Sequence, residues 1–554
     1  MAFVLSLAMV AGLVPAMSGG ANKVQAAAGS GTEPSVSAYA TKDQMMDDTF
    51  APDNTGTASN YGKLVFGKKK NFDDTYSALE WYILGKDEGV SGDNTIIFAA
   101  SPISTGKAFE NDDRNDKNYN SSFGEYTSDP TEVYPNHYGA SELRAALKDM
   151  ATNTSYFTIA EQGLMNPTTV TTNDTKNSVT YTTTDKLYAL QGNRDDKKKL
   201  WAGTSDNTVL ALNSYMSRGS ESWLRSPAVA DGFYGGASRA LVALPDDFGG
   251  VGGVGGGVGG GYVYNNFAVK PASNLNLSSV LFASAATAAS SGTKSGTITE
   301  GTAMTLRLDG TDKNIGTVTY NTTTGDIKVV KGSAQTVALV IQGNDGTDDW
   351  YFSKQITETK TLNVSYIKPK PSSSADIDLS ACKIWLETTD SAKNLTYAVN
   401  ATETNIKIIH SIAITDIDTP VPNTALDTKA SCTTEGVKST TPQITWTPSV
   451  TTAGYNTRYT ASITLTADTG YEFADNVTAT VSGNTATSVT NNADGTLTVT
   501  KKFTTDKRKI DSVAAPTVPA NNTFTTYYGY DGYAATPISG TNTELGKTAT
   551  VTFE

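Results

Sequence analysis

The sequence has very few of the side chains from which proteins build metal and redox sites. Among its 554 residues are two cysteines, Cys382 and Cys432, and two histidines, His137 and His410. A zinc site of the usual cysteine and histidine type is therefore not expected, and we predict neither a metal nor another cofactor. A disulfide between the two cysteines and two separate thiols in β-rich segments both remain open.

Positive charge and long apolar runs are also scarce. The chain carries 43 Lys and Arg against 56 Asp and Glu, which gives a net charge of -13. Nucleic-acid binding requires a basic surface and is not expected. After the N-terminus, no stretch is long and apolar enough to span a bilayer. With 38% hydrophobic residues, the chain can still form packed cores. The acidic net charge fits a secreted or cell-surface protein, which is what we expect.

The two ends of the chain suggest processing and truncation. Residues 1–28 combine an apolar run, Phe3–Pro15, with a small-residue cleavage site at Val24–Ala28, so they are predicted to be a signal peptide. Residues 29–58 are rich in Gly, Ser, Thr and Asp, which is typical of a linker. The last residues, Thr548–Glu554, resemble a strand cut within a module.

Residues 59–283 have the pattern of an α+β domain. Strands are predicted at Tyr61–Phe66, Leu79–Gly85 and Thr95–Ala100. Apolar residues at helical spacing predict a helix over Ser141–Met150 with Ser141 or a nearby residue as its cap.

Two further helical segments are expected in the same domain. Thr158 and Glu161 have the spacing of a capping box, so a helix should begin there. Ser205–Tyr215 is expected to contain a third short helical piece.

The remainder of the chain is predicted to be all β. Residues 284–369 and 405–515 contain short alternating strands separated by turns, which favours two immunoglobulin-like β-sandwiches. In the second, Tyr459, Ala461, Ile463 and Leu465 alternate with polar residues. Residues 370–404 are predicted to be a linker or short β segment, and residues 516–554 a partial β module.

One internal stretch lacks five residue types altogether. From Ala228 to Val269 there is no Lys, Glu, Gln, Met or Trp, the types that codons ending in C or T cannot encode. Its middle, Gly249–Gly261, consists of glycine and valine only. This pattern suggests a loop whose codons were rewritten between fixed borders, and a rewritten loop on a fixed scaffold varies what a protein binds.

The borders of this stretch belong to an ordered set of motifs. The motifs are Glu80–Asp87, Trp223–Pro227 and Ala268–Leu277. In these residues the domain resembles a bacterial family of unknown function that is common in secreted proteins of gut Firmicutes. That family usually has Arg where Lys270 stands. The resemblance covers about residues 60–283, less than half of the chain.

The resemblance implies a C-type-lectin-like fold, akin to that of the formylglycine-generating enzyme. The same fold carries the variable proteins of diversity-generating retroelements, in which template adenines are randomised near the C-terminal end of the domain. This mechanism would produce the residue types found from Ala228 to Val269. The later β-modules look like the immunoglobulin-like repeats of such surface proteins.

The candidate ligand-binding residues are the aromatic, Arg, Asp and Asn residues of the variable stretch, because these types supply most binding energy and directional hydrogen bonds. They are Phe233, Tyr234, Arg239, Asp246, Asp247, Phe248, Tyr262, Tyr264, Asn265 and Asn266. Phe267 is a further candidate, although either it or Phe248 is expected to be partly buried. The scaffold residues expected to hold the frame are Trp223, Arg225, Pro227, Pro271 and Asn274.

Catalysis finds little support in these residues. The related enzyme fold relies on a copper-binding cysteine pair, and both cysteines here lie outside the domain. His137 is interpreted as a surface loop residue, and Ser226 lacks a base and an elbow motif. The Asp-rich segments Glu110–Asp116 and Asn344–Asp349 could bind calcium, but solvated turns explain them more simply.

The sequence thus predicts an exported surface protein that binds a protein or glycan ligand through a diversified loop, without catalysis and without a transmembrane span. Attachment to the cell envelope is left open. The alternatives are a structural envelope protein with a flexible Gly-rich loop and, less favoured, a glycan-active enzyme, for which no carboxylate pair is found.

Overall fold

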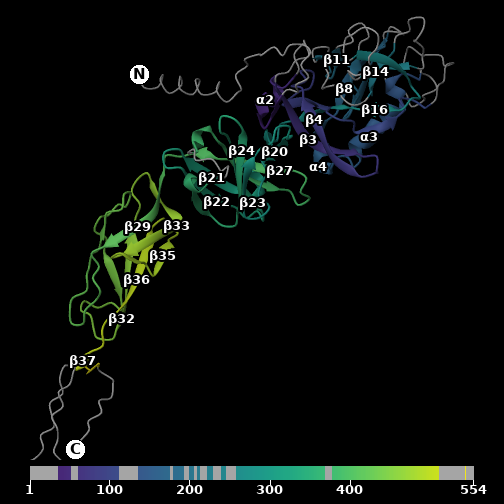
Figure 1. Cartoon of the computed structure of the whole chain (residues 1–554). Coiled ribbons are helices and arrows are strands. Elements are labelled where there is room, and N and C mark those ends of the chain that lie inside the picture. Colours follow the sequence, from purple (N-terminus) through teal and green to yellow (C-terminus); the bar gives the residue numbers. More distant parts are fainter. Residues whose placement is uncertain are drawn as a thin grey trace, which may run out of the picture. The chain divides into compact units, whose positions relative to one another are not determined.

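A computed structural model describes most of the chain in two compact units (Figure 1). The described residues are 35–51, 60–111, 135–174, 179–192, 199–204, 209–211, 221–228, 239–244, 257–367, 377–510 and 543–544. The first unit comprises the described residues up to Val318, with Val330–Glu358 and Ile367–Ala401. The second comprises Thr319–Val329, Thr359–Tyr366 and the described residues from Thr402 onward. The predicted signal peptide lies outside the described residues.

β-Sheets make up most of the first unit. The central sheet has the order β1 (Ser35–Ser37), β3 (Asn60–Lys70), β4 (Tyr76–Ile83), β5 (Asn94–Ala99), β17 (Ala272–Asn276) and β7 (Met165–Asn166). A second sheet has the order β15 (Gly257–Tyr262), β14 (Arg239–Leu244), β13 (Ser222–Pro227), β16 (Phe267–Val269) and β6 (Ser104–Lys107). Smaller sheets pair β8 (Thr168–Asp174) with β9 (Val179–Asp185), and β11 (Lys199–Trp201) with β10 (Gln191–Gly192) and β12 (Val209–Ala211).

Two of the helices follow the sequence signals. Helix α3 covers Glu142–Thr152, and its N-cap Ser141 accepts a hydrogen bond from the backbone N–H of Arg144. Helix α4 covers Ile159–Leu164 with the complete capping box of Thr158 and Glu161. Both predicted helices are confirmed. The third is wrong where it can be judged, because Val209–Ala211 forms β12; its other residues lie outside the described ones.

The segment assigned to a linker is part of the fold from Ser35 onward. β1 pairs in parallel with β3, and β2 (Tyr39–Thr41) pairs with β18 (Val280–Ser284). Helix α2 (Lys42–Met46) begins at a capping box formed by Thr41 and Gln44. Ala40, Met45 and Phe50 are buried in the main core. The linker prediction is therefore wrong for residues 35–51, where few apolar side chains are enough because each one reaches a core built by other segments. Residues 29–34 and 52–58 lie outside the described residues.

The main core also crosses the predicted domain boundary at residues 283 and 284. One cluster joins Leu147 of α3 and Trp81 of β4 to Ala283 of β18 and Leu306 of β20. β18 and β20 belong to a sheet with the order β19 (Thr293–Thr297), β24 (Asp349–Ile356), β23 (Val337–Asn344), β26 (Lys383–Thr389), β27 (Thr396–Asn400), β20 (Thr305–Asp309), β18 and β2. Of residues 370–404, predicted to be a linker or a short β segment, the described part supplies the sheet strands β26 and β27.

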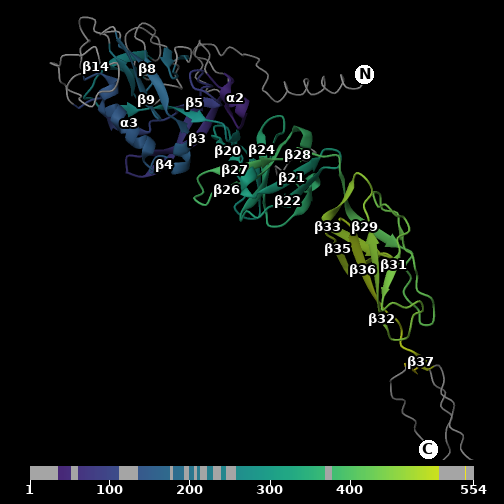
Figure 2. The same ribbon diagram turned by 180° about the vertical axis from the view of Figure 1, so that it is seen from behind.

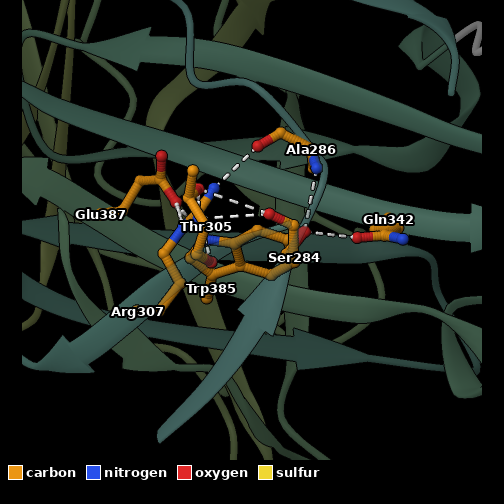
Figure 3. Close-up of polar contacts among 7 residues, drawn as sticks. All are labelled: Ser284, Ala286, Thr305, Arg307, Gln342, Trp385 and Glu387. Atoms are coloured by element: carbon orange, nitrogen blue, oxygen red, sulfur yellow. Dashed lines mark hydrogen bonds and ion pairs between the residues drawn. The ribbon is translucent and has the colours of Figure 1, made fainter. Parts of the chain in front are cut away.

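A buried ion pair lies within this sheet (Figure 3). The Nε of Arg307 on β20 is 2.7 Å from Oε2 of Glu387 on β26, and both side chains are 3% exposed. The guanidinium also donates to the carbonyl oxygen of Ala286 at 2.7 Å, and the indole N–H of Trp385 donates to Glu387 at 2.5 Å. Each charged group is therefore hydrogen-bonded as well as paired, which buried charges require.

Replacing Arg307 with Met should lower the free energy of unfolding by about 3–5 kcal/mol, because Glu387 would stay buried without its cation. Urea denaturation measures this loss. In R307M/E387Q the amide still accepts from Trp385 and carries no charge, so part of the loss should be regained. The control K42M removes the exposed Lys42–Asp93 ion pair and should cost less than about 1 kcal/mol. Equal losses in R307M and K42M would contradict the analysis.

The second unit contains a β-sandwich (Figure 1, Figure 2). One sheet has the order β30 (Ser431–Cys432), β29 (Lys407–Thr415), β33 (Tyr471–Val481) and β34 (Asn484–Thr485). The other has the order β31 (Ile444–Thr447), β32 (Arg458–Leu465), β36 (Leu497–Thr504) and β35 (Ser488–Asn491). Alternate residues of both sheets form one core, including Tyr459, Ala461, Ile463 and Leu465, so the alternation predicted for β32 is confirmed. The immunoglobulin-like assignment stays a prediction.

The remaining described elements complete the chain. A further sheet has the order β25 (Lys360–Asn363), β22 (Asp326–Lys331), β21 (Gly316–Asn321) and β28 (Thr402–Glu403), and β37 (Lys509–Ile510) pairs with β38 (Thr543–Glu544). The 3₁₀ turns are η3 (Tyr138–Ala140), η4 (Thr311–Lys313), η5 (Val364–Tyr366) and η6 (Leu379–Ala381). Both cysteines are free thiols, and burial raises the pKa of Cys382 to about 12. Within the described ranges, no helix has the length and apolar character needed to cross a membrane.

Candidate functional site

The codon-restricted stretch contributes an antiparallel pair of strands, β14 and β15, to the second sheet. Arg239 lies opposite Tyr262, and Leu241 lies opposite Gly260. Residues 257–261 of the glycine-rich run are therefore paired backbone, although the sequence suggested a loop. Glycine weakens strands because it has no side chain to pack. Here the adjacent strand β14 supplies the apolar contacts, since Ala240 and Val242 are buried in the main core.

A tight turn at the end of β15 presents two tyrosines to solvent. The backbone N–H of Asn265 donates to the carbonyl oxygen of Tyr262 at 2.9 Å. Tyr262 is 38% exposed and Tyr264 is 42% exposed. Their rings are stacked, with centroids 5.2 Å apart and planes 18° apart. Stacked and exposed aromatic rings form a rigid apolar platform of the kind that binding surfaces use.

Val263, between the two tyrosines, anchors the turn from inside. Its side chain is fully buried in the main core. Its carbonyl oxygen accepts hydrogen bonds from the backbone N–H groups of Phe109 at 2.9 Å and Glu110 at 3.1 Å. The turn is thus held by one buried side chain and two backbone bonds, which leaves both neighbouring side chains outside.

Some of the other candidate ligand residues lie in or beside the same turn, and the rest lie outside the described residues. Asn265 is half-buried, Asn266 is exposed, and both lie in the same turn as the tyrosines. The backbone of Arg239 is paired with Tyr262, so the register places it beside the turn. The candidates outside the described residues are Phe233, Tyr234, Asp246, Asp247 and Phe248.

Trp223 is the aromatic centre of the frame below the turn. It is 1% exposed, and its indole N–H donates to the carbonyl oxygen of Lys107 at 2.8 Å. Phe109 and Phe267 pack edge-on against it, with centroids 5.4 and 4.8 Å away. Phe267 is partly buried as a result, which agrees with the expectation that one of the two phenylalanines would be.

Arg225 lies on β13 next to Trp223 and is also 1% exposed. Its guanidinium donates twice to the carbonyl oxygen of Thr171, at 3.1 and 2.9 Å, and once to that of Ala189 at 2.8 Å. Its backbone N–H donates to Leu190 at 2.8 Å. These contacts are those of a structural pin rather than of a ligand-binding group.

The remaining scaffold residues are buried as well. Pro227 ends β13, and the carbonyl oxygen of Pro271 accepts from the backbone N–H of Ala99 at 2.9 Å. The amide of Asn274 donates to Asn94 Oδ1 at 2.9 Å, and its oxygen accepts from Asn166 at 2.8 Å. Asn274 thereby joins the strands β5 and β7 on either side of β17.

Sequence reasoning missed Asn94 and Asp87, which extend this network. Asn94 Oδ1 also accepts from the backbone N–H of Asp87 at 3.0 Å. The carboxylate of Asp87 accepts from the backbone N–H and the hydroxyl of Thr204 at 2.8 and 2.6 Å. A buried carboxylate must be satisfied in this way. Its position at the end of the Glu80–Asp87 motif was the available signal.

The residues weighed for catalysis or metal binding have structural roles. His137 is 1% exposed and stacks on Tyr181 at 4.1 Å, which corrects its assignment to the surface. Ser226 exchanges hydrogen bonds of 3.0 Å with the backbone of Gly192. In the Asn344–Asp349 turn, the carboxylate of Asp345 accepts from the backbone N–H groups of Thr347 and Asp348. The described residues contain no metal-binding cluster of His, Cys, Asp and Glu.

Comparison with known proteins gives no family for this chain. No family model matches it, and no curated protein matches it.

The two neighbouring glycines of β15 should respond oppositely to substitution. A Cβ at buried Gly261 would lie 2.5 Å from Cε2 of Phe267 and 2.8 Å from Cγ2 of Val242. G261V should therefore lower the free energy of unfolding by about 1–3 kcal/mol. Gly260 is exposed, so G260V is the matched control and should change stability by less than about 0.5 kcal/mol. Urea denaturation compares them, and equal effects would contradict this orientation of the strand.

Lys270 should make stability depend on pH. Burial lowers its pKa from 10.5 to about 8. Between about pH 8 and 10.5 the unfolded chain therefore holds a proton that the folded chain has lost, and the Lys270 contribution to the free energy of unfolding rises with pH. Below about pH 8 the burial penalty is fully present.

The variant K270M has no proton to lose at this position. The free energy of unfolding of K270M minus that of the wild type should be largest at about pH 7 and should decrease as the pH rises to 10.5. Urea denaturation at stepped pH values measures this difference. K68M changes an exposed lysine and should show no such narrowing. A K270M difference that stays constant with pH would disprove the assignment.

Proposed function

We propose that this protein is an exported or cell-surface ligand-binding protein that acts in adhesion or recognition. Its N-terminal region is a C-type-lectin-like domain that displays a retroelement-diversified segment, and immunoglobulin-like modules form a stalk. The ligand is a protein or glycan outside the cell. Recognition is non-covalent and uses no cofactor and no catalysis.

One observation carries this proposal. The Tyr262–Tyr264 stack is exposed, lies within the codon-restricted stretch and is fixed from below by Val263. Aromatic rings that remain partly exposed supply much of the energy of binding surfaces. The buried frame residues Trp223 and Arg225 lie just outside the stretch. The frame residues lie outside the stretch in the sequence, and the two tyrosines lie on its exposed side.

The pattern of exposure also supports diversification. From Gly260 to Tyr264, exposed and buried residues alternate: Gly260, Tyr262 and Tyr264 are exposed, while Gly261 and Val263 are buried. Asn265 and Asn266 add amide groups next to the rings. Codons for the exposed residues can change freely, whereas a change at the buried ones alters the core.

The test is to sequence the locus in closely related strains. We expect differences between strains to concentrate in Ala228–Val269 and, near the turn, at the exposed positions 260, 262, 264 and 266. Positions 261 and 263 should stay constant, as should Trp223 and Arg225. A near-copy of the segment with adenines at the mismatched positions should lie beside a reverse transcriptase gene.

Other outcomes would overturn the proposal. Without a near-copy and a reverse transcriptase gene, the glycine-rich strand would belong to a structural envelope protein. Substitutions found equally often at exposed and buried positions would show that the variation is not directed at a binding surface. This would contradict the proposal even if the near-copy were present.

A further inference from the structure

A second candidate site lies on the central sheet and shares no residue with the tyrosine turn. Strand β4 directs Leu79, Trp81 and Ile83 into the main core. Glu80 and Tyr82 alternate with them and line a surface pocket of about 350 Å³. Lys63 and Lys69 of β3, and Ser101 after β5, line the same pocket. Ligand pockets commonly begin at about this volume.

The pocket contains two cations and one anion. Lys63 forms an ion pair with Glu80, in which the lysine side chain is 16% exposed and the carboxylate 39% exposed. The ammonium group of Lys69 donates to the hydroxyl of Ser101 at 3.2 Å. An ammonium has three donors and a carboxylate has two oxygens, so the hydrogen bonds within the pocket do not use all of these groups.

The size and charges indicate what the pocket can hold. A volume of about 350 Å³ lies at the lower end of the range for ligand pockets and is large enough for one sugar residue with a carboxylate. The excess of one positive charge favours a monoanion. The carboxylate of Glu80 can accept hydrogen bonds from hydroxyl groups of a ligand, and it repels a phosphate dianion. A sugar carboxylate offers both an anion for the lysines and hydroxyls for Glu80.

We propose that this pocket binds a single acidic sugar residue, such as a hexuronate. The carboxylate of the sugar lies between Lys63 and Lys69, and its hydroxyls donate to Glu80. Tyr82 provides an aromatic wall, as is usual in pockets for small ligands. This site shares no residue with the diversified segment. The domain could therefore bind the same class of ligand here whatever the sequence of that segment.

Calorimetric titration of the full chain with sodium galacturonate tests this site. Galactose, which lacks the carboxylate, and inorganic phosphate, which lacks the sugar, are titrated in parallel. We expect galacturonate to bind at least about tenfold more tightly than either. The variant K69M should weaken galacturonate binding about tenfold or more. E80Q should weaken galacturonate binding but strengthen that of phosphate, because it removes the repelling charge.

The matched control is K68M, which removes the same charge from the adjacent residue of β3 that does not line the pocket. It should leave galacturonate affinity unchanged, and thermal unfolding of K69M should equal that of the wild type. The proposal fails if galactose or phosphate binds as tightly as galacturonate. It also fails if K68M and K69M have equal effects, or if no galacturonate binding occurs up to about 10 mM.

Discussion

The buried guanidinium of Arg225 is the constraint on which the frame of the first unit depends. Strand β13 is buried along its whole length, so a charged side chain within it must find all its partners inside the protein. The carbonyl oxygens of Thr171 and Ala189 provide them. These contacts fix β13 against β8 and the segment after β9. Because Trp223 is held by the same strand, the chain enters the codon-restricted stretch at one defined place.

The sequence predicted those helices and strands whose formation depends on residues close together in the chain. The caps of α3 and α4 were readable because a hydroxyl and a carboxylate at fixed spacing satisfy the first N–H groups of a helix. The alternation in β32 was readable because one face is buried. Thr41 and Gln44 have the same capping-box spacing as Thr158 and Glu161. No helix was predicted there, because the surrounding residues are polar.

Long-range contacts account for what the sequence could not indicate. Met45 and Phe50 look isolated along the chain and become buried only because β3 and β18 bring a core to them. The same core joins segments on both sides of residue 283, where a change in composition suggested a domain boundary. At the candidate site, the aromatic content of the stretch was visible in the sequence. The role of Val263 as an anchor could not be predicted from the sequence. It depends on contacts with Phe109 and Glu110, which lie more than a hundred residues earlier in the chain.

The glycine-rich strand has a consequence for how a surface of this kind can evolve. Gly260 is exposed, and its backbone is paired with that of Leu241 on β14. Every replacement there adds atoms and removes none. The pairing with β14 sets the direction of the chain, so the chemical character of this exposed position can change while the course of the backbone stays as it is.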